Sequence, residues 1–325
     1  MTRLLCTLTQ VSLAAVVLVA PLAAPAQDYP NRPITVVVPF PPGASTDATG
    51  RIMQDPMSRA LGQTIVVENR GGAGGTTGSL SVANAKPDGY TLLSTVNATI
   101  TMNQYTQKNF PYDARTAFAP ISLIAESVLA LAVTSSLPVK TVQELIDYAK
   151  KNPGKLSFGS AGVGSGHHIA GSLLNKLAGI DMVHVPYRGG GPAIQDLVAG
   201  TIQVSFGTLP AVLPQAQAGK IRIIAVVDTK RHPDLPDVPA IEETVKGVKS
   251  TVWLGLFAPV GTPRPIIDKL NRVVADALKI PDVVAKLRLQ GLTAQGSTPD
   301  ELAKLVRTEI DDWGRIIPAI GIEPE

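Results

Sequence analysis

Short apolar runs alternate with amphipathic stretches of helical length along most of this chain, and this alternation constrains the fold more than any other feature. Apolar runs of about four to eight residues are typical of buried strands, and the amphipathic stretches between them are typical of covering helices. The runs that predict strands are residues 34–38, 64–68, 90–94, 121–125, 129–133, 156–159, 183–185, 204–206 and 221–227. The sequence therefore predicts an α/β fold of βα units around mainly parallel sheets.

Capping and stop signals mark the ends of several predicted helices. Residues 141–150 predict a helix because Thr141 and Glu144 have capping-box spacing and a Pro-Gly stop follows at 153–154. Pro56 lies within the first predicted helix and should kink or interrupt it. Other helices are expected near residues 168–178, 192–199, 263–278 and 299–313.

The first 26 residues have the pattern of a secretory signal. Arg3 is followed by an apolar stretch at 11–22 and by an Ala-Pro-Ala cleavage site that ends at Ala26. The apolar stretch is short for a transmembrane helix. We expect export with cleavage after Ala26, which leaves 299 residues (325 minus 26) and removes Cys6. The mature protein would then have neither a disulfide nor a thiol nucleophile, because Cys6 is the only cysteine.

The mature length exceeds the size at which a single hydrophobic core usually stops growing, so two domains are expected. The stretches at 125–133 and 248–257 both look extended, which suggests that two strands cross between the domains. We expect a first lobe formed by 27–127 and 250–325, with a second lobe at 128–249 inserted into it. The mature chain carries 28 basic residues (29 minus Arg3) against 26 acidic ones and no basic block, so nucleic acid is not an expected partner.

Two loops that join a predicted strand to a predicted helix are candidates for anion binding. The first follows the strand at 34–38 and contains Pro-Phe-Pro-Pro-Gly before the helix, whereas the second, at 159–166, reads Gly-Ser-Ala-Gly-Val-Gly-Ser-Gly. The first N–H groups of a helix lack internal partners and carry about half a positive charge, so they can hold a carboxylate or phosphate. Glycine allows the backbone to approach such a ligand closely.

In the first loop, we expect the backbone N–H groups of Gly43 to Thr46 and the hydroxyls of Ser45 and Thr46 to surround an oxyanion. Asp47 would cap the helix, since its charge would repel an acid. An ordinary strand-to-helix turn is the alternative for this loop. A third glycine cluster, at 71–78, either lines the same cleft or forms a flexible turn.

Several other functions lack their sequence signals. Neither loop ends in Gly-Lys-Ser/Thr, neither has the full dinucleotide-binding pattern, and the chain has no Gly-x-Ser-x-Gly elbow. His167 and His168 are adjacent and have no third ligand at usable spacing, so we expect no metal and no cofactor. Acyl or phosphoryl transfer by Ser165 and His168 stays as the enzymatic alternative.

The mature chain resembles, over essentially its whole length, the Bug family (Bordetella uptake genes) of periplasmic solute-binding proteins of tripartite tricarboxylate transporters. The matching segments are Tyr29-Pro30-Asn31-Arg32-Pro33-Ile34, Pro39-Phe40-Pro41-Pro42-Gly43 with Asp47 and Arg51, Glu68-Asn69-Arg70 with Gly74-Gly75, Lys86-Pro87-Asp88-Gly89-Tyr90-Thr91-Leu92, Ser160-Ala161-Gly162-Val163-Gly164-Ser165, His184-Val185-Pro186-Tyr187-Arg188-Gly189-Gly190, Ala218-Gly219-Lys220-Ile221-Arg222, Pro236-Asp237-Val238-Pro239 and Ala258-Pro259-Val260-Gly261-Thr262-Pro263.

The resemblance implies a type II periplasmic-binding-protein-like fold, in which two α/β lobes enclose a ligand by hinge closure. It also implies that one carboxylate of an organic acid lies between the two glycine-containing loops, held by backbone amides and water. The ligand-binding residues expected from the loops and from the resemblance are Phe40, Pro42, Gly43, Ala44, Ser45, Thr46, Thr95, Asn97, Ser160, Ala161, Gly162, Gly164, Ser165, Phe206, Gly207 and Thr208.

Gly207 stands where many members of the family have an acidic residue, which in amino-acid binders can meet the ammonium group of the ligand. Ala44 replaces a second glycine that is frequent in the first loop. We therefore expect a non-amino mono- or dicarboxylate as ligand. We expect a monomer that delivers its ligand to membrane permease subunits; the alternatives are a sensor that docks on a signalling receptor and an exported hydrolase or transferase on the same fold.

Overall fold

The computed structural model describes residues 29–43, 45–248 and 250–324. The predicted signal segment, residues 1–26, lies outside the described residues. Among the described helices, none combines the length and apolar character that crossing a membrane requires. The strands are β1 (Ile34–Val38), β2 (Ile65–Asn69), β3 (Thr91–Val96), β4 (Phe118–Thr134), β5 (Ser157–Ser160), β6 (Val183–Pro186), β7 (Val204–Thr208), β8 (Ile221–Val226), β9 (Thr251–Pro259) and β10 (Thr293–Ala294).

Helices precede or follow most of these strands, as the alternating pattern predicts. The α-helices are α1 (Ser45–Leu61), α2 (Thr76–Ala83), α3 (Asn103–Thr106), α4 (Val142–Lys151), α5 (Gly166–Ala178), α6 (Gly190–Ala199), α7 (Leu209–Gln217), α8 (Arg264–Ala277), α9 (Pro281–Leu289) and α10 (Pro299–Ala319). Short helices of other types are η1 (Ala73–Gly75), the π-helix η2 (Ala98–Met102) and η3 (Ile241–Glu243).

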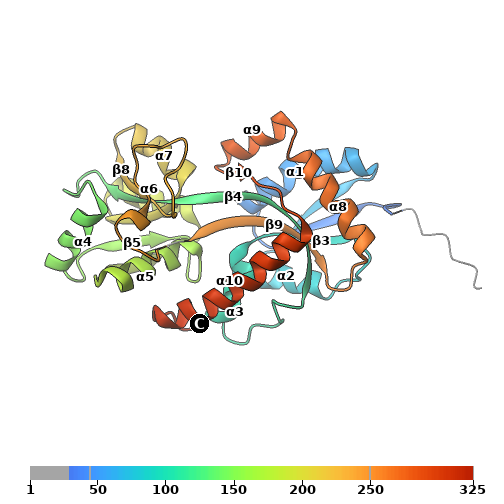
Figure 1. Ribbon diagram of the computed structural model, residues 1–325, viewed down its shortest axis with the longest axis horizontal. Helices are drawn as coiled ribbons and strands as arrows, with labels where there is room; N and C mark the ends of the chain where they lie inside the picture. Colours follow the sequence, from blue (N-terminus) through green and yellow to red (C-terminus); the bar gives the residue numbers. More distant parts are fainter. Residues whose placement is uncertain (1–28, 44, 249, 325) are drawn as a thin grey trace, which may run out of the picture.

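The strands follow the spatial order β2-β1-β3-β9-β4-β7-β5-β6, with β8 and β10 paired to β4 outside this path. β1 pairs in parallel with β2 and β3, and β5 pairs in parallel with β6 and β7. β4 and β9 are antiparallel to their neighbours and run between two groups of helices (Figure 1). The parallel βα units expected from the sequence therefore occupy both ends, and an antiparallel pair connects them.

β4 is one strand of 17 residues, although two separate strands were predicted at 121–125 and 129–133. Glu126 and Ser127 interrupt the apolar pattern, yet both continue the strand: Glu126 is opposite Thr293 of β10, and the Ser127 hydroxyl donates to the carbonyl of Gly291 at 3.1 Å. β4 pairs with β9 as far as Val128 and with β7 and β8 after it. This change of partner lies at the predicted lobe boundary; the division into lobes itself stays a prediction.

The predicted capping pair of α4 is present in part: Thr141 caps the helix, but the carboxylate of Glu144 binds one residue before the N-cap. The Thr141 hydroxyl accepts from the Glu144 N–H at 3.1 Å, and the Glu144 carboxylate accepts from the Lys140 N–H. The expected interruption at Pro56 was wrong, because α1 continues without a break from Ser45 to Leu61. Pro56 is buried, and its packing favours a helix that remains whole despite one missing N–H donor.

Helix α10 contacts two hydrophobic cores. Leu302 and Ile310 belong to a cluster that also contains Phe257 of β9. Trp313, in the next turns, belongs to a different cluster that contains Phe158 of β5. In Figure 1, α10 correspondingly runs obliquely across the region where β4 and β9 connect the two halves. One helix therefore contributes side chains to both hydrophobic clusters, and it packs mainly along β4, η2 and α3.

Candidate binding cleft

A cleft of about 640 Å³ lies between the two halves of the molecule. Its walls are the β1–α1 loop, the β5–α5 loop, the start of α6, the η2 segment and part of β9. The starts of α1 and α5 both contribute to the wall, through Ser45 and Thr46 on one side and Gly166 and His167 on the other. Two helix N-termini therefore reach one cavity, as the two-loop hypothesis requires.

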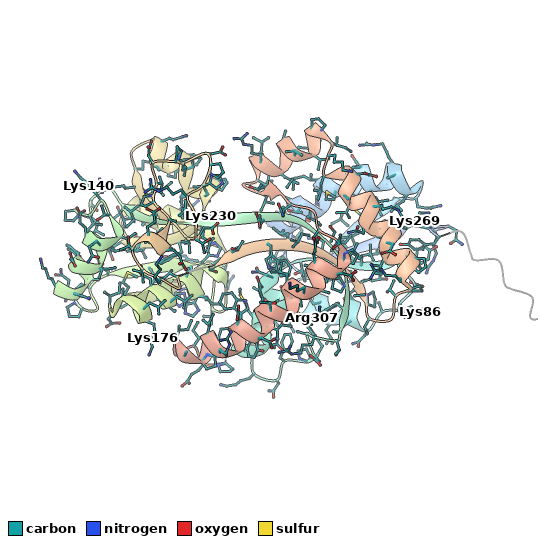
Figure 2. All side chains as sticks on the ribbon, viewed as in Figure 1. Lys86, Lys140, Lys176, Lys230, Lys269 and Arg307 are labelled. Atoms are coloured by element: carbon teal, nitrogen blue, oxygen red, sulfur yellow. The ribbon has the colours of Figure 1, made fainter. Side chains whose placement is uncertain are left out.

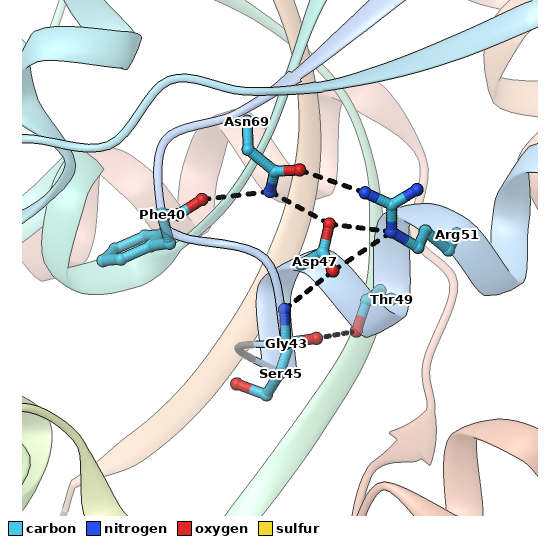
Figure 3. Close-up of polar contacts among 7 residues, drawn as sticks. All are labelled: Phe40, Gly43, Ser45, Asp47, Thr49, Arg51 and Asn69. Atoms are coloured by element: carbon cyan, nitrogen blue, oxygen red, sulfur yellow. Dashed lines mark hydrogen bonds and ion pairs between the residues drawn. The ribbon is translucent and has the colours of Figure 1, made fainter.

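The β1–α1 loop is held by the carboxylate of Asp47, the third residue of α1 (Figure 3). Asp47 accepts hydrogen bonds from the Gly43 N–H at 2.9 Å, from Asn69 Nδ2 at 2.9 Å and from Arg51 Nε at 3.0 Å. Asn69 Nδ2 also donates to the Phe40 carbonyl at 3.0 Å. The predicted role of Gly43 therefore changes, because its N–H is directed to Asp47 and is not free for a ligand.

Asp47 shapes this loop without contributing charge to the cleft. Its carboxylate is buried and does not belong to the cleft lining. Burial alone would raise its pKa, but the hydrogen bonds from Arg51, Gly43 and Asn69 lower the pKa below the ordinary value of 3.8. The ionised carboxylate therefore holds the loop by accepting hydrogen bonds from it. The capping role expected for Asp47 is confirmed, although Asp47 lies in the first turn of α1 and accepts from the Gly43 N–H, which precedes the helix.

In the β5–α5 loop, the side chains and glycine amides bind mostly to one another. Ser165 is the N-cap of α5: its hydroxyl accepts from the His168 N–H at 3.3 Å and donates to the Gly162 carbonyl at 2.6 Å. The Gly164 N–H donates to His168 Nδ1 at 3.2 Å. Gly164 has φ +74°, and a Cβ there would stand 2.7 Å from the Thr106 hydroxyl. Glycine is required here for both conformation and space.

Several backbone amides of this loop remain for a ligand, and two of them are at the start of α5. Within the described part of the chain, the N–H groups of Gly166 and His167 donate to no protein acceptor, and both residues line the cleft. This agrees with the general rule that the first amides of a helix have no intrahelical partner. α5 therefore presents unpaired donors and the positive end of its dipole to the cavity.

The enzymatic alternative loses its base in this geometry. The ring of His168 accepts from the Gly164 N–H and stacks on His184 at 3.8 Å, so it is not a base for Ser165. A different serine, Ser160, lies 2.6 Å from His184 Nε2. Ser160 is buried and does not line the cleft, so this pair holds the loop together.

Ten of the expected ligand-binding residues line the cleft: Phe40, Pro42, Gly43, Ser45, Thr46, Asn97, Ala161, Gly164, Ser165 and Thr208. Five others do not: Thr95, Ser160, Gly162, Phe206 and Gly207. Ala44 lies outside the described residues. Packing explains why four of these five residues do not line the cleft. Gly162 is excluded by a hydrogen bond, because its N–H turns inward and donates to the Ser160 hydroxyl at 3.1 Å.

Three of the excluded residues point into cores. Thr95 is fully buried on β3 and donates its hydroxyl to Thr99 at 3.1 Å. Phe206 belongs to the same hydrophobic cluster as Phe158. A Cβ at Gly207 would stand 2.6 Å from Val212 of α7, so a side chain at this position would point toward α7. The expectation that Gly207 faces the ligand was therefore wrong, because strand residues alternate between faces.

The cleft also contains residues that the sequence analysis did not assign to it. Gly74 lines the wall, which favours the cleft interpretation of the glycine cluster at 71–78 over a flexible turn. The stretch from Arg188 to Pro192 also lines it, and so does His167. The three glycines after Arg188 could have indicated that this stretch lies in the cleft, since part of the run belongs to a segment that matches the family. The stretch was not assigned to the cleft, because the glycines precede the predicted start of the helix at residue 192.

The charged groups that line the cleft are of one sign, positive. Of the described residues that line it, none is acidic, and Arg188 is the only one with a permanent charge. His167 is neutral, because burial lowers its pKa to about 4. Figure 2 shows the labelled Lys86, Lys140 and Lys269 around the outer parts of the molecule. The cleft is therefore suited to an anion, and its described lining offers no carboxylate to a cationic group.

Comparison with protein families agrees with this architecture. The model of the tripartite tricarboxylate transporter family receptor matches residues 49–322. The chain belongs to this family. Protein BugT of Bordetella pertussis is 33% identical over 323 residues, which cover 99% of the chain and 98% of BugT. The resemblance found in the sequence is thereby confirmed.

Solved structures of family members show the same fold. Rpa4515 from R. palustris, solved with adipate, is 35% identical, with a TM-score of 0.81 over 92% of this chain and 100% of its own. MatC from Rhodopseudomonas palustris, solved with bound malate, is also 35% identical, with a TM-score of 0.78 over 89% of this chain and 100% of its own. The predicted α/β fold of periplasmic-binding-protein type is confirmed, and these family members are binding proteins.

Proposed function

We propose that this protein is a periplasmic solute-binding protein that captures a small organic carboxylate in its cleft and delivers it to the permease of a tripartite tricarboxylate transporter. The observation that carries the proposal is the convergence of the α1 and α5 N-termini on a cavity without acidic lining residues. Such N-termini hold anions through backbone N–H groups and helix dipoles. The carboxylates bound to Rpa4515 and MatC support the same class of ligand.

The lining also supports a non-amino acid. An α-ammonium group would need a carboxylate or several carbonyl acceptors when it is removed from water. None of the described lining residues is acidic, whereas Arg188 would repel a second positive charge. This argument replaces the one based on Gly207, whose side-chain direction is away from the cavity.

The direct test is ligand binding by the refolded mature protein, measured by thermal unfolding and calorimetry. Matched pairs separate the classes: succinate against aspartate, and glutarate against glutamate. A non-amino acid at a hundredfold excess over its dissociation constant should stabilise the protein by about 2.7 kcal/mol. Absence of a shift with every carboxylate would overturn the proposal, and a preference for the amino acids would overturn its non-amino part.

Ser45→Asp tests the location of the site. Ser45 is the exposed first residue of α1, where a carboxylate favours the helix dipole, so the fold should keep its stability or gain up to about 1 kcal/mol. A fixed negative charge about 4 Å from a bound carboxylate costs roughly 4 kcal/mol at an effective dielectric constant of about 20, close to a thousandfold in affinity. Ser135→Asp, in an exposed turn outside the cleft, is the matched control. Unchanged affinity in Ser45→Asp would remove the α1 N-terminus from the site.

Periplasmic location and delivery need separate measurements. The mature protein should appear in the osmotic-shock fraction of cells that express the full chain, with Gln27 as its first residue by mass spectrometry. Delivery should appear as ligand uptake that depends on both this protein and the permease subunits. Uptake that is independent of the binding protein would contradict the transport role while leaving ligand binding intact.

A further inference from the structure

The backbone amides of the β5–α5 loop divide into two alternating sets. The N–H groups of Gly162 and Gly164 donate to side chains of the protein, at 3.1 Å and 3.2 Å. Within the described part of the chain, the N–H groups of Ala161 and Val163 donate to no protein acceptor, and both residues line the cleft. Because each peptide unit is a rigid plane, the bonds made by residues 162 and 164 restrict where the neighbouring unpaired amides point.

The acceptor for the second of these amides is His168. This residue lies in the first turn of α5, and its Nδ1 accepts from the Gly164 N–H at 3.2 Å. A ring nitrogen that accepts a hydrogen bond carries no proton, so the ring proton of His168 is on Nε2. The ring is buried and does not line the cleft. His168 therefore reaches the cleft only through Gly164.

His184, on β6, holds the other inward amide through Ser160. The Ser160 hydroxyl lies 2.6 Å from His184 Nε2, a distance usual for a hydroxyl donor and short for an N–H donor. The carbonyl of Gly162 is a competing acceptor at 3.2 Å, but it already accepts from the hydroxyl and the N–H of Ser165. The hydroxyl proton therefore goes to His184 Nε2, and the ring proton of His184 is on Nδ1.

The two histidine rings form one stacked and neutral pair. Their centroids are 3.8 Å apart and their planes differ by 10°, and Phe158 stacks on His184 at 5.0 Å. Burial and the adjacent ring of His184 lower the pKa of His168 to about 3, and burial lowers the pKa of His184 to about 4. Both rings are therefore neutral near pH 7, so each keeps one nitrogen available as an acceptor.

We infer that His168 and His184 are positioning residues for ligand binding: as acceptors with opposite tautomers, they hold the β5–α5 loop so that its unpaired amides face the cleft. This inference rests on the proposed function, since it names residues that set the affinity of the same cleft. Neither ring lines the cleft, so each acts through the loop. A role in packing alone would require only the shape of the ring, whereas this role requires an acceptor at one particular atom.

Asparagine and glutamine separate the two roles because their amide oxygens reach different positions. The oxygen of asparagine lies near the position of Nδ1, and that of glutamine lies near the position of Nε2. In calorimetry with succinate, glutarate and adipate, His168→Asn and His184→Gln should therefore bind within about threefold of the wild type. His168→Gln and His184→Asn should bind about tenfold or more weakly. Helix propensity ranks glutamine above asparagine, so it predicts the opposite order at His168.

His232→Asn and His232→Gln are the matched controls. The Nδ1 of His232 also accepts a backbone N–H, from Asp234 at 3.2 Å, but His232 does not line the cleft. Both variants should bind within about threefold of the wild type. A second readout needs no substitution: NMR of the ring nitrogens in the ligand-free protein near pH 7 should find the proton on Nε2 of His168 and on Nδ1 of His184.

Three results would overturn the positioning role. They are equal losses for asparagine and glutamine at both positions, affinities equal to the wild type in all four variants, and any other placement of the two ring protons. Failure of every carboxylate to bind the wild type would instead overturn the proposed function, and the inference with it.

Discussion

Replacement of Asp47 by asparagine should weaken ligand binding even though Asp47 does not line the cleft. The carboxylate joins the Gly43 amide, Asn69 and Arg51 (Figure 3), so it fixes the course of the β1–α1 loop. Asparagine retains one acceptor oxygen and places an NH₂ group where the other oxygen accepted a hydrogen bond. Two donors would then face each other in a buried position, which the loop can relieve only by moving.

The expected loss follows from these contacts. Hydrogen bonds to a charged group are worth about 1.5–3 kcal/mol, and the Gly43 and Asn69 bonds are shielded from water. The ion pair with Arg51 adds about 1 kcal/mol at most, since the Arg51 side chain is 49% exposed. We expect the free energy of unfolding to fall by roughly 2–4 kcal/mol and ligand affinity to fall about tenfold or more.

Urea denaturation and calorimetry measure both effects, and Asp282→Asn provides the control. Asp282 is also an acid in the first turn of a helix with a base four residues later, Lys286, but its side chain is 70% exposed. Its replacement should cost about 0.5 kcal/mol or less. A loss in Asp47→Asn no larger than in Asp282→Asn, with unchanged affinity, would refute the argument that buried hydrogen bonds to Asp47 organise the loop.

The pH dependence has a defined sign. Because the pKa of Asp47 is lower in the folded protein than the ordinary 3.8, the stabilisation is fully present above that value. It is lost as the pH falls through the lowered pKa. The difference in stability between the wild type and Asp47→Asn should therefore be constant near neutral pH and shrink under strongly acidic conditions.

Three further predictions concern the rest of the cleft. The pKa of His167 is about 4 in the folded protein and about 6.5 when it is unfolded, so the unfolding free energy should fall by roughly 3 kcal/mol as the pH drops from 6.5 to 4. In His167→Gln, the unfolding free energy measured by urea denaturation should depend less on pH over this range. Gly207→Asp should cost about 3 kcal/mol or more in urea denaturation without creating affinity for aspartate, because its side chain would meet Val212. Gly164→Ala should lower the unfolding free energy by roughly 1–3 kcal/mol and weaken ligand binding in calorimetry, because the residue has φ +74° and its Cβ would meet Thr106. For each of the three variants, stability and affinity equal to those of the wild type would contradict the reasoning.

The sequence predicted elements well where local chemistry decides the structure. The capping pair Thr141 and Glu144 marks the start of α4 because both hydrogen bonds are local. The continuity of β4 could not be predicted in the same way. Glu126 and Ser127 look like a break until β10, from a distant part of the chain, supplies their partners. Long-range pairing of this kind leaves no local signal.

The candidate site shows the same limit. The loops that precede α1 and α5 were predicted from their glycines and caps, and both line the cleft. Ser160 was assigned to the lining because a serine in a glycine loop resembles a ligand contact, but it ends β5 and its hydroxyl turns to His184. The start of α6 was missed because the helix was expected only from residue 192. Its first two residues, Gly190 and Gly191, are glycines, which do not signal a helix in the sequence.

Helix α10 contributes to both hydrophobic clusters, although none of its residues lines the cleft. Its 21 residues pack on one core through Ile310 and on the other through Trp313, and Glu309 between them accepts from Trp253 Nε1 of β9 at 2.8 Å and from the Thr101 hydroxyl at 2.9 Å. A straight helix cannot follow both halves if they rotate apart, so separation of the halves strips packing from one of its ends. If the cleft opens and closes by such a rotation, side chains of α10 that never meet the ligand would help to set the balance between the two forms, and substitutions along α10 would change affinity without altering the cleft walls.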